Sequence, residues 1–212
     1  IVASLPMTWA QTIVVASGIT GLTLPGMIEL PGWRLGRAIS PSPQTVAPGA
    51  DDNGSGSVAV LAAARLLAGM PSDYTIYFLC VTAEEQGLIG SEHFAAAADQ
   101  QNLDIRGVLN FDMIGWYDPA GADLWIEGFR QGVSSLWLMQ MLQQNAEAYA
   151  GLSPYLSPGE GWGSDHEPFH DHGFPAILSI ENEWDEYPCY HRACDTVDQL
   201  TSEPEQNAGL YA

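Results

Sequence analysis

The chain has 212 residues, of which 46% are hydrophobic and 10% aromatic, so it is long and apolar enough to form a globular domain with a substantial core. This composition excludes a disordered tail and a small disulfide-stapled scaffold. Asp and Glu number 26 against six basic residues, all of them Arg, which gives a formal net charge of −20. Because a field of that sign repels phosphate backbones, we expect no nucleic-acid partner.

The N-terminal part of the chain has few charges. Residues 1–28 contain no charged side chain, but they lack a basic leader and are interrupted by Pro6 and Pro25. They therefore fit neither a membrane-spanning helix nor a cleavable signal peptide, and we expect no membrane partner. Any export signal would have preceded Ile1.

Three cysteines are too few for a disulfide framework. Cys189 and Cys194 lie five residues apart, a span that one bridge could close. Such a bridge favours an oxidising compartment, so we expect a secreted or periplasmic protein.

Apolar strands alternate with Ala- and Leu-rich helices along the chain. In order, the patterns predict a strand over residues 12–17, a helix over 57–70, a strand over 74–82, a helix over 91–101, a strand over 107–111, a helix over 134–150 and a strand over 175–180. This alternation predicts an α/β fold in three layers around a largely parallel central sheet. In such folds ligands bind at the carboxyl ends of the strands.

Three of these elements carry specific expectations of burial. Residues 74–82 are nearly unbroken in β-branched and aromatic side chains, which is typical of a strand buried on both faces. The helix over 57–70 has its apolar residues at the spacing of a helix packed on a sheet. In the helix over 134–150, we expect four residues to face inward, namely Leu136, Met139, Leu142 and Ala146.

Acidic residues follow the predicted strands. Glu84 and Glu85 come after the strand over 74–82, Asp112 follows the strand over 107–111, and Asp52 lies in the turn before the first helix. Each has an ordinary interpretation by itself, such as a helix cap for Asp52 or a solvated loop for the glutamates. Together they place carboxylates at the ends of buried strands, which is costly unless a cation compensates them. With no Lys and few Arg, a metal ion is the natural compensator.

The residue types indicate which metal. Carboxylate oxygens together with an imidazole, which His191 supplies, match zinc or a similar divalent ion, and two ions close together would need a shared carboxylate. Adjacent glutamates suit such a centre, because one can ligate the metal while the other acts as general base on the bound water.

These residues stand in five segments that resemble, in order, the motifs of the M28 zinc aminopeptidases, including bacterial leucyl aminopeptidases. The segments are Ala-Pro-Gly-Ala-Asp-Asp-Asn-Gly-Ser-Gly at 47–56, Val-Thr-Ala-Glu-Glu-Gln-Gly-Leu-Ile-Gly-Ser at 81–91, Leu-Asn-Phe-Asp-Met-Ile-Gly at 109–115, Ser-Asp-His-Glu-Pro-Phe at 164–169 and Tyr-His-Arg-Ala-Cys-Asp-Thr at 190–196. The resemblance covers roughly residues 41–200. It implies a three-layer sandwich with a mixed, mostly parallel sheet, and a co-catalytic two-zinc exopeptidase acting on peptides with a free N-terminus.

The resemblance also implies individual roles. Asp52 would be the bridging carboxylate, Glu84 the general base, Glu85 and His191 ligands of one zinc, Asp112 a ligand of the other, and Tyr190 the residue that stabilises the tetrahedral intermediate. Asp165 and His166 would have a supporting or substrate-cleft role. Residues 1–212 would form a single peptidase domain with an atypical N-terminal part and a truncated C-terminal helix.

One family motif is missing. The family has a His-x-Asp motif after an early strand, whose histidine completes the zinc site of the second aspartate, but the first histidine of this chain is His93. If the motif follows the strand over residues 12–17, its His and Asp positions are occupied by Ile19 and Gly21. If it directly precedes the Pro-rich loop over residues 40–49, those positions are occupied by Leu35 and Arg37. The zinc of Asp52 and Asp112 would then lose one ligand. Residues 7–38 match the family poorly. Either a frame error or natural decay of the sequence would account for this mismatch.

Three functions remain open at this point. The first is a zinc aminopeptidase, the second a single-zinc acyltransferase of the glutaminyl-cyclase type, and the third a catalytically impaired relic or binding domain. The unaltered motifs favour the peptidase, and the missing histidine favours the relic. The sequence does not predict the oligomeric state or the side-chain preference.

Other residues carry weaker predictions. We expect His93 to be structural and His170 and His172 to lie in a solvated loop. A zinc knuckle formed by Cys189, His191 and Cys194 is disfavoured, because a fourth ligand is absent. Four aromatic residues near the motifs could wall an apolar specificity pocket, namely Trp116, Trp162, Phe169 and Trp184.

Overall fold

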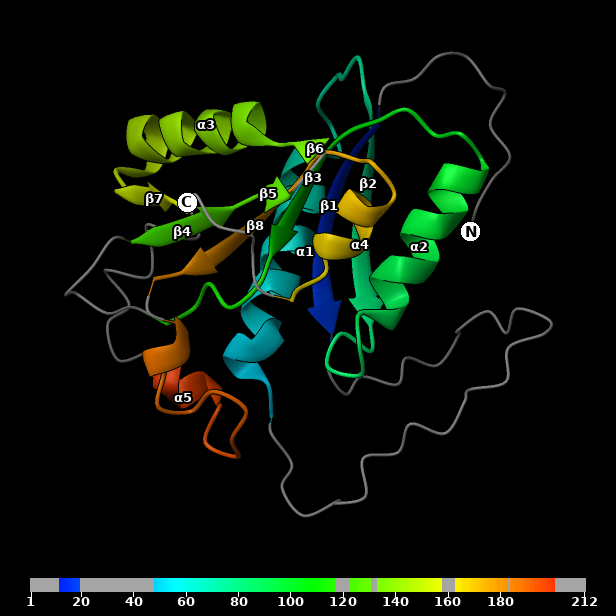
Figure 1. Cartoon of the computed structure of the whole chain (residues 1–212). Helices are drawn as coiled ribbons and strands as arrows, with labels where there is room; N and C mark the ends of the chain where they lie inside the picture. The colour runs from blue at the N-terminus through cyan, green and yellow to red at the C-terminus, as the bar shows by residue number, and fades with distance from the viewer. Residues whose placement is uncertain are drawn as a thin grey trace.

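The computed structural model describes residues 12–19, 48–116, 123–130, 133–157, 163–182 and 184–200. Its centre is a six-stranded sheet in the order β2-β1-β3-β8-β4-β7 (Figure 1). The strands are β1 (Thr12–Ile19), β2 (Thr75–Thr82), β3 (Ile105–Phe111), β4 (Leu124–Glu127), β7 (Pro154–Leu156) and β8 (Ala176–Glu181). All neighbouring pairs are parallel except β4 and β8, so the predicted mixed, mostly parallel sheet is confirmed.

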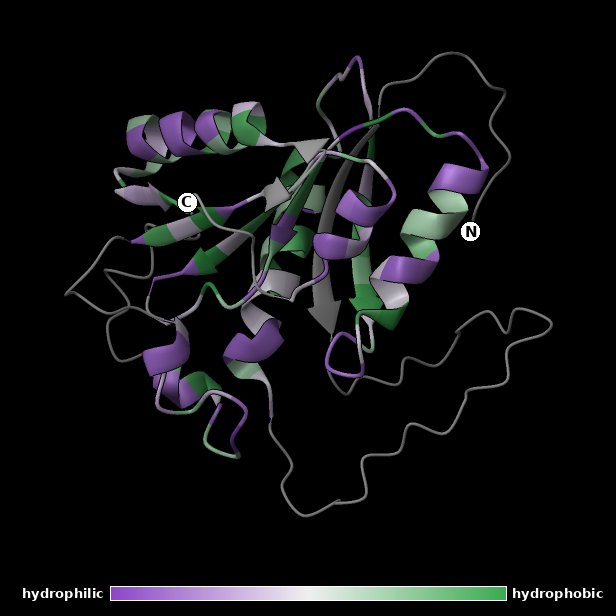
Figure 2. Cartoon of the chain, in the orientation of Figure 1, coloured by the Kyte–Doolittle hydropathy of each residue, from purple (hydrophilic) through white to green (hydrophobic). Residues whose placement is uncertain are grey.

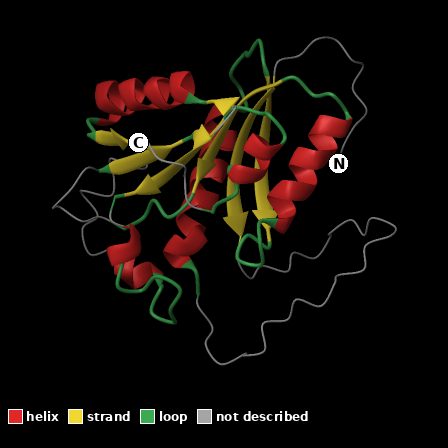
Figure 3. Ribbon diagram, in the orientation of Figure 1, coloured by secondary structure: helices red, strands yellow, loops and turns green. Residues whose placement is uncertain are grey.

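Helices cover both faces of this sheet (Figure 3). They are η1 (Ala50–Ser55), α1 (Gly56–Leu67), α2 (Ile89–Gln100), α3 (Leu136–Asn145), η2 (Ala146–Ala150), α4 (Glu167–Asp171), η3 (Trp184–Glu186) and α5 (Val197–Leu200). The short strands β5 (Phe129–Arg130) and β6 (Val133–Ser134) pair with each other. None of the helices in the described part of the chain has the length and apolar composition that a membrane span requires.

Two hydrophobic clusters join the layers. On one face α2 and α4 pack on the sheet through Ala95, Phe169 and Val108. On the other face α3 packs on β4 and β8 through Leu138, Met139 and Ile126, with Ala59 of α1 against the same cluster. In Figure 2 hydrophobic residues, drawn in green, are prominent on β2, β4 and β8. The predicted three-layer α/β sandwich is confirmed.

The expected burial of the strand over 74–82 is wrong. Tyr77 in β2 is 36% exposed, and among the β2 side chains Val81 alone is buried, at 8% exposed. The cause is its place in the sheet, because in the described structure β2 is an outer strand that pairs with β1 alone. Its apolar run reflects strand propensity more than burial.

Two helices also differ from expectation. Leu136 is 47% exposed, and Leu138, 3% exposed, occupies the core instead. The reason is that the buried stripe of α3 runs through Leu138, Met139 and Leu142, and at about 100° per residue Leu136 lies roughly 110° from the centre of that stripe. Among the apolar side chains of α1 that were expected to pack on the sheet, Val60 is buried, whereas Leu61 is 63% exposed.

The register of the three adjacent parallel strands brings their carboxyl ends together. The Cα of Ile19, the last residue of β1, pairs with that of Thr82 in β2, and Ala16 pairs with Asn110 in β3. The chain segments that follow β1, β2 and β3 therefore leave the same edge of the sheet. This edge carries the acidic residues that follow β2 and β3.

Candidate metal centre

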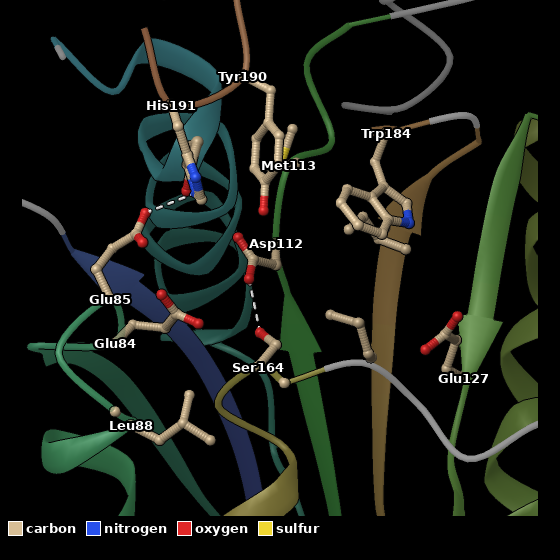
Figure 4. A pocket seen from close by; sticks show the side chains of 15 residues that line it. Glu84, Glu85, Leu88, Asp112, Met113, Glu127, Ser164, Trp184, Tyr190 and His191 are labelled. Carbon is tan, nitrogen blue, oxygen red and sulfur yellow. Dashed lines mark hydrogen bonds and ion pairs between the residues drawn. The ribbon is translucent and has the colours of Figure 1, made fainter. Parts of the chain in front are cut away.

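The carboxylates are presented where the chain turns sharply out of two strands. Ala83 follows β2 with φ 61° and Met113 follows Asp112 with φ 48°, both in the left-handed region. Asp52 lies in η1, and His191 lies in the segment before α5. Four segments far apart in sequence thus meet around one cavity (Figure 4).

Three side chains converge on a single point. His191 Nε2 lies 3.1 Å from Asp52 Oδ2 and 3.0 Å from Glu85 Oε1. One donor atom from each residue lies within 4.8 Å of the others, and this is the one such set of three among the described residues. A nitrogen and two carboxylate oxygens at this spacing fit a zinc ion with a position left for water.

Asp112 lies beside this set without joining it. Its Oδ2 accepts a hydrogen bond of 2.6 Å from Ser164 Oγ, which in turn accepts one of 2.9 Å from Asn110 Nδ2. The serine holds the Asp112 carboxylate toward the cavity (Figure 4).

The crowded negative charges of this cluster favour binding of a cation. Burial, followed by repulsion from Asp112 and the glutamates, raises the pKa of Asp52 to about 9. Burial and the neighbouring carboxylates raise the pKa of Glu84 to about 8 and that of Asp112 to about 7. These shifts show that the folded chain crowds negative charge here without a Lys or Arg in the cavity wall. A divalent ion would relieve the repulsion.

The ligand loops are fastened to each other by Asp195. Its Oδ1 accepts the backbone N–H of Asp51 at 2.9 Å, and its Oδ2 accepts that of Asp52 at 3.1 Å. Tyr187 donates its hydroxyl to the same carboxylate at 3.0 Å. Because Asp195 lies four residues after His191, this clamp ties the loop of one candidate ligand to the loop of another.

A disulfide closes the His191 loop. The Sγ atoms of Cys189 and Cys194 are 2.09 Å apart, so the pairing that the spacing allowed is present in the structure. The two sulfurs bond to each other, and the disfavoured zinc knuckle is excluded. His191, with φ 54°, lies inside the closed loop.

Asn53 and Asp51 fasten η1 to the loop after β3. Asn53 Nδ2 donates to the carbonyl oxygen of Phe111 at 2.9 Å, and Asn53 Oδ1 accepts the N–H of Gly56 at 3.0 Å where α1 begins. Asp51 Oδ1 accepts the N–H of Gly115 at 2.8 Å. A Cβ atom at Gly56 would collide with the Phe111 carbonyl and the Asn53 side chain, so this approach requires glycine.

A cavity of about 390 Å³ opens beside the cluster. Tyr190 and Trp184 form part of its wall, and the Tyr190 ring lies 3.8 Å from the His191 ring, centre to centre. Burial and the nearby carboxylates raise the pKa of the Tyr190 hydroxyl well above its usual range, so it keeps its proton. It can therefore donate a hydrogen bond into the cavity.

Several sequence expectations about the surroundings are corrected. His170 is not in a solvated loop, since it lies in α4, 4% exposed, with Nε2 2.8 Å from the Ala176 carbonyl oxygen. Neither Phe169 nor Trp116 lines the cavity. Phe169 is a core residue between α2 and the sheet, and the Trp116 ring packs at a tilted angle against Tyr187. Of the four aromatic residues proposed for the pocket, Trp184 alone is confirmed, and Trp162 lies outside the described residues.

Other predicted residues lie behind the cavity or on the surface. Asp165 and His166 are each 1% exposed, and Asp165 accepts a 2.5 Å hydrogen bond from Ser91, which agrees with a supporting position. His93 is exposed on α2. His172 lies between Glu92 and Asp99.

Sequence reasoning missed two buried glutamates and gave no role to Asp195. Glu127 on β4 lines the cavity, and Glu181 at the end of β8 accepts the N–H of Trp116 at 2.7 Å. Each is the only charged residue of a short apolar strand, which was the available signal.

The backbone of β1 ends with Ile19 at the same edge of the sheet as Asp112, and the Ile19 register of the missing histidine stays a prediction. Leu35 and Arg37, the alternative slot, lie outside the described residues.

Comparison with known proteins is consistent with this geometry. Aminopeptidase YwaD of Bacillus subtilis is 34% identical over 166 residues, which are 76% of this chain and 36% of YwaD. The solved LapA aminopeptidase of Legionella pneumophila superposes with a TM-score of 0.71 at 26% identity, covering 96% of this chain and 48% of LapA. BSAP, a zinc aminopeptidase from Bacillus subtilis, gives 0.70 at 26% identity, covering 98% and 46%.

This chain therefore spans about a third to a half of these longer proteins. The profile described as peptidase family M28 matches residues 37–211, which is most of the chain. Since the matched region contains all five sequence motifs and the converged donor set, the chain belongs to peptidase family M28.

Proposed function

We propose that this protein is a zinc-dependent aminopeptidase that removes N-terminal residues from peptides. The observation that carries the proposal is the convergence of Asp52, Glu85 and His191 on one point, with Glu84 beside them at an open cavity. The names of the relatives YwaD and BSAP agree with it.

The metal content that we propose is one firmly held ion. Asp52, Glu85 and His191 provide a nitrogen and two oxygens, whereas Asp52 and Asp112 alone provide oxygens only. The sequence contains no histidine before His93 and no cysteine before Cys80, so residues 1–47 hold no nitrogen or sulfur side-chain donor of the usual kind. Oxygen ligands without an imidazole bind zinc more weakly.

A bound zinc ion would polarise the scissile carbonyl and lower the pKa of a water molecule. The residues of the chain then divide the remaining work. Glu84, next to a ligand and half-buried in the cavity wall, accepts the proton of the attacking water and returns it to the leaving amine. Tyr190, which keeps its proton, donates a hydrogen bond to the oxygen on which charge develops.

The test is zinc content per chain, measured together with turnover of leucyl-p-nitroanilide and of a peptide with N-terminal glutamine. An aminopeptidase with one firm site gives about one zinc and releases p-nitroaniline. Cyclisation of the glutaminyl peptide without release of p-nitroaniline supports the acyltransferase, and zinc binding without either reaction supports the relic.

A further inference from the structure

His191 is the most exposed of the three residues in the donor set. Its side chain is 49% exposed, compared with 12% for Asp52 and 30% for Glu85. Its backbone has φ 54°, a left-handed conformation that is unfavourable for residues other than glycine. Such a conformation persists only where the surrounding structure imposes it. The nitrogen of the donor set therefore depends on the constraints that hold its loop.

The loop is anchored on both sides of His191. On the N-terminal side Cys189, 5% exposed, packs in the same hydrophobic cluster as Tyr187. On the C-terminal side the buried Asp195 accepts two backbone N–H groups of the η1 loop. Residues 191–194, which lie between these anchors, are all exposed. Packing alone therefore does little to hold the segment that contains His191.

The disulfide joins the exposed end of this segment to its buried end. Cys194 is exposed, Cys189 is buried, and the bridge between them encloses His191. One backbone hydrogen bond spans the same turn, from the N–H of Arg192 to the carbonyl oxygen of Cys189 at 3.0 Å. The bridge thus adds a covalent constraint to the turn in which His191 takes its left-handed conformation.

A small thiol can reach this bridge through its exposed half. The thiolate attacks the sulfur of Cys194 and forms a mixed disulfide with it, while the electron pair of the broken S–S bond leaves on the sulfur of Cys189. A second thiol then attacks the sulfur of the bound thiol and releases Cys194. In total two thiols give two electrons and two protons to the protein, which gains two cysteine thiols, and the small molecule leaves as its disulfide.

We propose that the bridge between Cys189 and Cys194 is a redox switch that controls zinc affinity through His191. This inference rests on the proposed zinc-dependent function and adds its regulation. Once the bridge is reduced, His191 can leave the left-handed conformation, so its Nε2 is no longer held toward the two carboxylates. Zinc affinity should then fall by about 10- to 100-fold, the usual effect of losing a group that orients a ligand.

The coupling also acts in the reverse direction. Because zinc binding and reduction are linked equilibria, zinc must make the bridge harder to reduce by the same factor by which the bridge strengthens zinc binding. A factor of about 10 to 100 lowers the reduction potential of the bridge by about 30 to 60 mV when zinc is bound. A bridge that stabilised the fold without orienting His191 would show no such shift.

The first experiment measures zinc affinity by competition with a chromogenic chelator. Oxidised wild type should bind zinc about 10- to 100-fold more tightly than the double variant Cys189→Ala with Cys194→Ser, which keeps the buried position apolar and lacks the bridge. Wild type reduced with a phosphine should bind as weakly as this variant. Cys80→Ser, which removes the exposed free thiol of β2 and keeps the bridge, should bind like the oxidised wild type.

The second experiment measures the reduction potential of the bridge in the wild type. The protein is equilibrated in glutathione buffers with and without zinc, and the free thiols are alkylated and counted by mass spectrometry. The oxidised chain should show one thiol, that of Cys80, and the reduced chain three. The zinc-bound protein should need a potential about 30 to 60 mV lower for half-reduction.

The outcomes separate the switch from the proposed function, because neither experiment needs turnover. Coupling between zinc and the bridge in a protein that hydrolyses no anilide supports the switch and refutes the peptidase. Equal zinc affinity with and without the bridge, or a potential that zinc does not change, overturns the switch in an active enzyme. Tighter zinc binding after reduction also overturns it, because the freed thiolates would then be ligands themselves.

The fold of the chain without its bridge is checked by circular dichroism. If the double variant does not fold, the reduced wild type provides the same comparison with its native side chains. If the reduced wild type also unfolds, the bridge is a requirement for folding and the switch is overturned.

Discussion

His191 and His172 each lie between two carboxylates, but the two histidines use their ring nitrogens differently. In His191 the single atom Nε2 faces both Asp52 and Glu85. In His172, Nδ1 faces Asp99 at 3.2 Å and Nε2 faces Glu92 at 3.3 Å. Donor atoms that converge suit one shared cation, whereas donors that diverge suit an imidazolium with a proton on each nitrogen.

The surroundings of the two histidines reinforce the contrast. The His191 loop is closed by a disulfide and fastened through Asp195 to the η1 loop. His172 follows the short helix α4, and its partners Glu92 and Asp99 are exposed on α2. The composition His plus two carboxylates thus does not define a metal site, whereas the direction of the nitrogens and the rigidity of the loops do.

Replacing each of the two histidines by alanine should give the largest expected difference, which is a difference in zinc content. His191→Ala should abolish firm zinc binding, because it removes the only nitrogen from the donor set. His172→Ala, the matched control, should leave zinc content near one per chain. Elemental analysis after dialysis measures both, and equal zinc content in the two variants would show that His191 is not a ligand.

Glu84→Gln should lower kcat by about 10²–10⁴, the usual contribution of a general base, while zinc content is unchanged. The change keeps the size of the side chain and removes its ability to accept a proton. Glu186→Gln is the control for loss of one negative charge. If Glu84→Gln loses zinc as well, Glu84 is a ligand and the assignment of the adjacent glutamates is reversed.

Asp195→Asn should weaken zinc affinity by about 10- to 100-fold, as for other residues that orient ligands. The amide presents one acceptor oxygen where the structure uses two, so the N–H of Asp51 or Asp52 loses its partner. Competition with a chromogenic chelator measures the affinity. Tyr187→Phe removes only the third hydrogen bond to Asp195 and should have a smaller effect, and a larger effect for Tyr187→Phe would contradict the clamp.

The double substitution Ile19→His with Gly21→Asp should raise zinc content from about one toward two. The Cα of Ile19 pairs with that of Thr82, so the new imidazole would start at the edge where Asp112 lies. Leu35→His with Arg37→Asp tests the other slot. If neither pair raises the zinc content, a single missing ligand does not account for the one-zinc content that we propose.

Sequence patterns predicted the features of this molecule that depend on residues close together in the sequence. The strands ending before Glu84 and Asp112 were found because each has a continuous apolar run, and parallel strands bring such ends together. The exposure of β2 was missed, because an apolar run does not tell an outer strand from a central one. The role of Asp195 was missed for a similar reason, since it depends on hydrogen bonds to residues 143 and 144 positions away.

The smallest expected effect concerns the pH dependence of stability at His172. Hydrogen bonds to Asp99 and Glu92 raise the pKa of His172 above its ordinary value of 6.5, so folding stabilises the protonated ring. The contribution is therefore fully present below pH 6.5 and is lost as the pH rises through the higher pKa of the folded state. Because Glu92 and Asp99 are exposed, it should amount to no more than about 1 kcal/mol.

Urea unfolding of wild type and His172→Gln at pH 5.5 and pH 8.5 measures this contribution as the difference in unfolding free energy. The wild type should be more stable than the variant at pH 5.5 and nearly equal to it at pH 8.5, with His93→Gln on the exposed face of α2 as the control. A difference that grows toward pH 8.5 would mean that the neutral ring is the stabilised form. His172 would then resemble His191 in offering a neutral nitrogen, and the contrast between a histidine placed for a proton and one placed for a metal would fail.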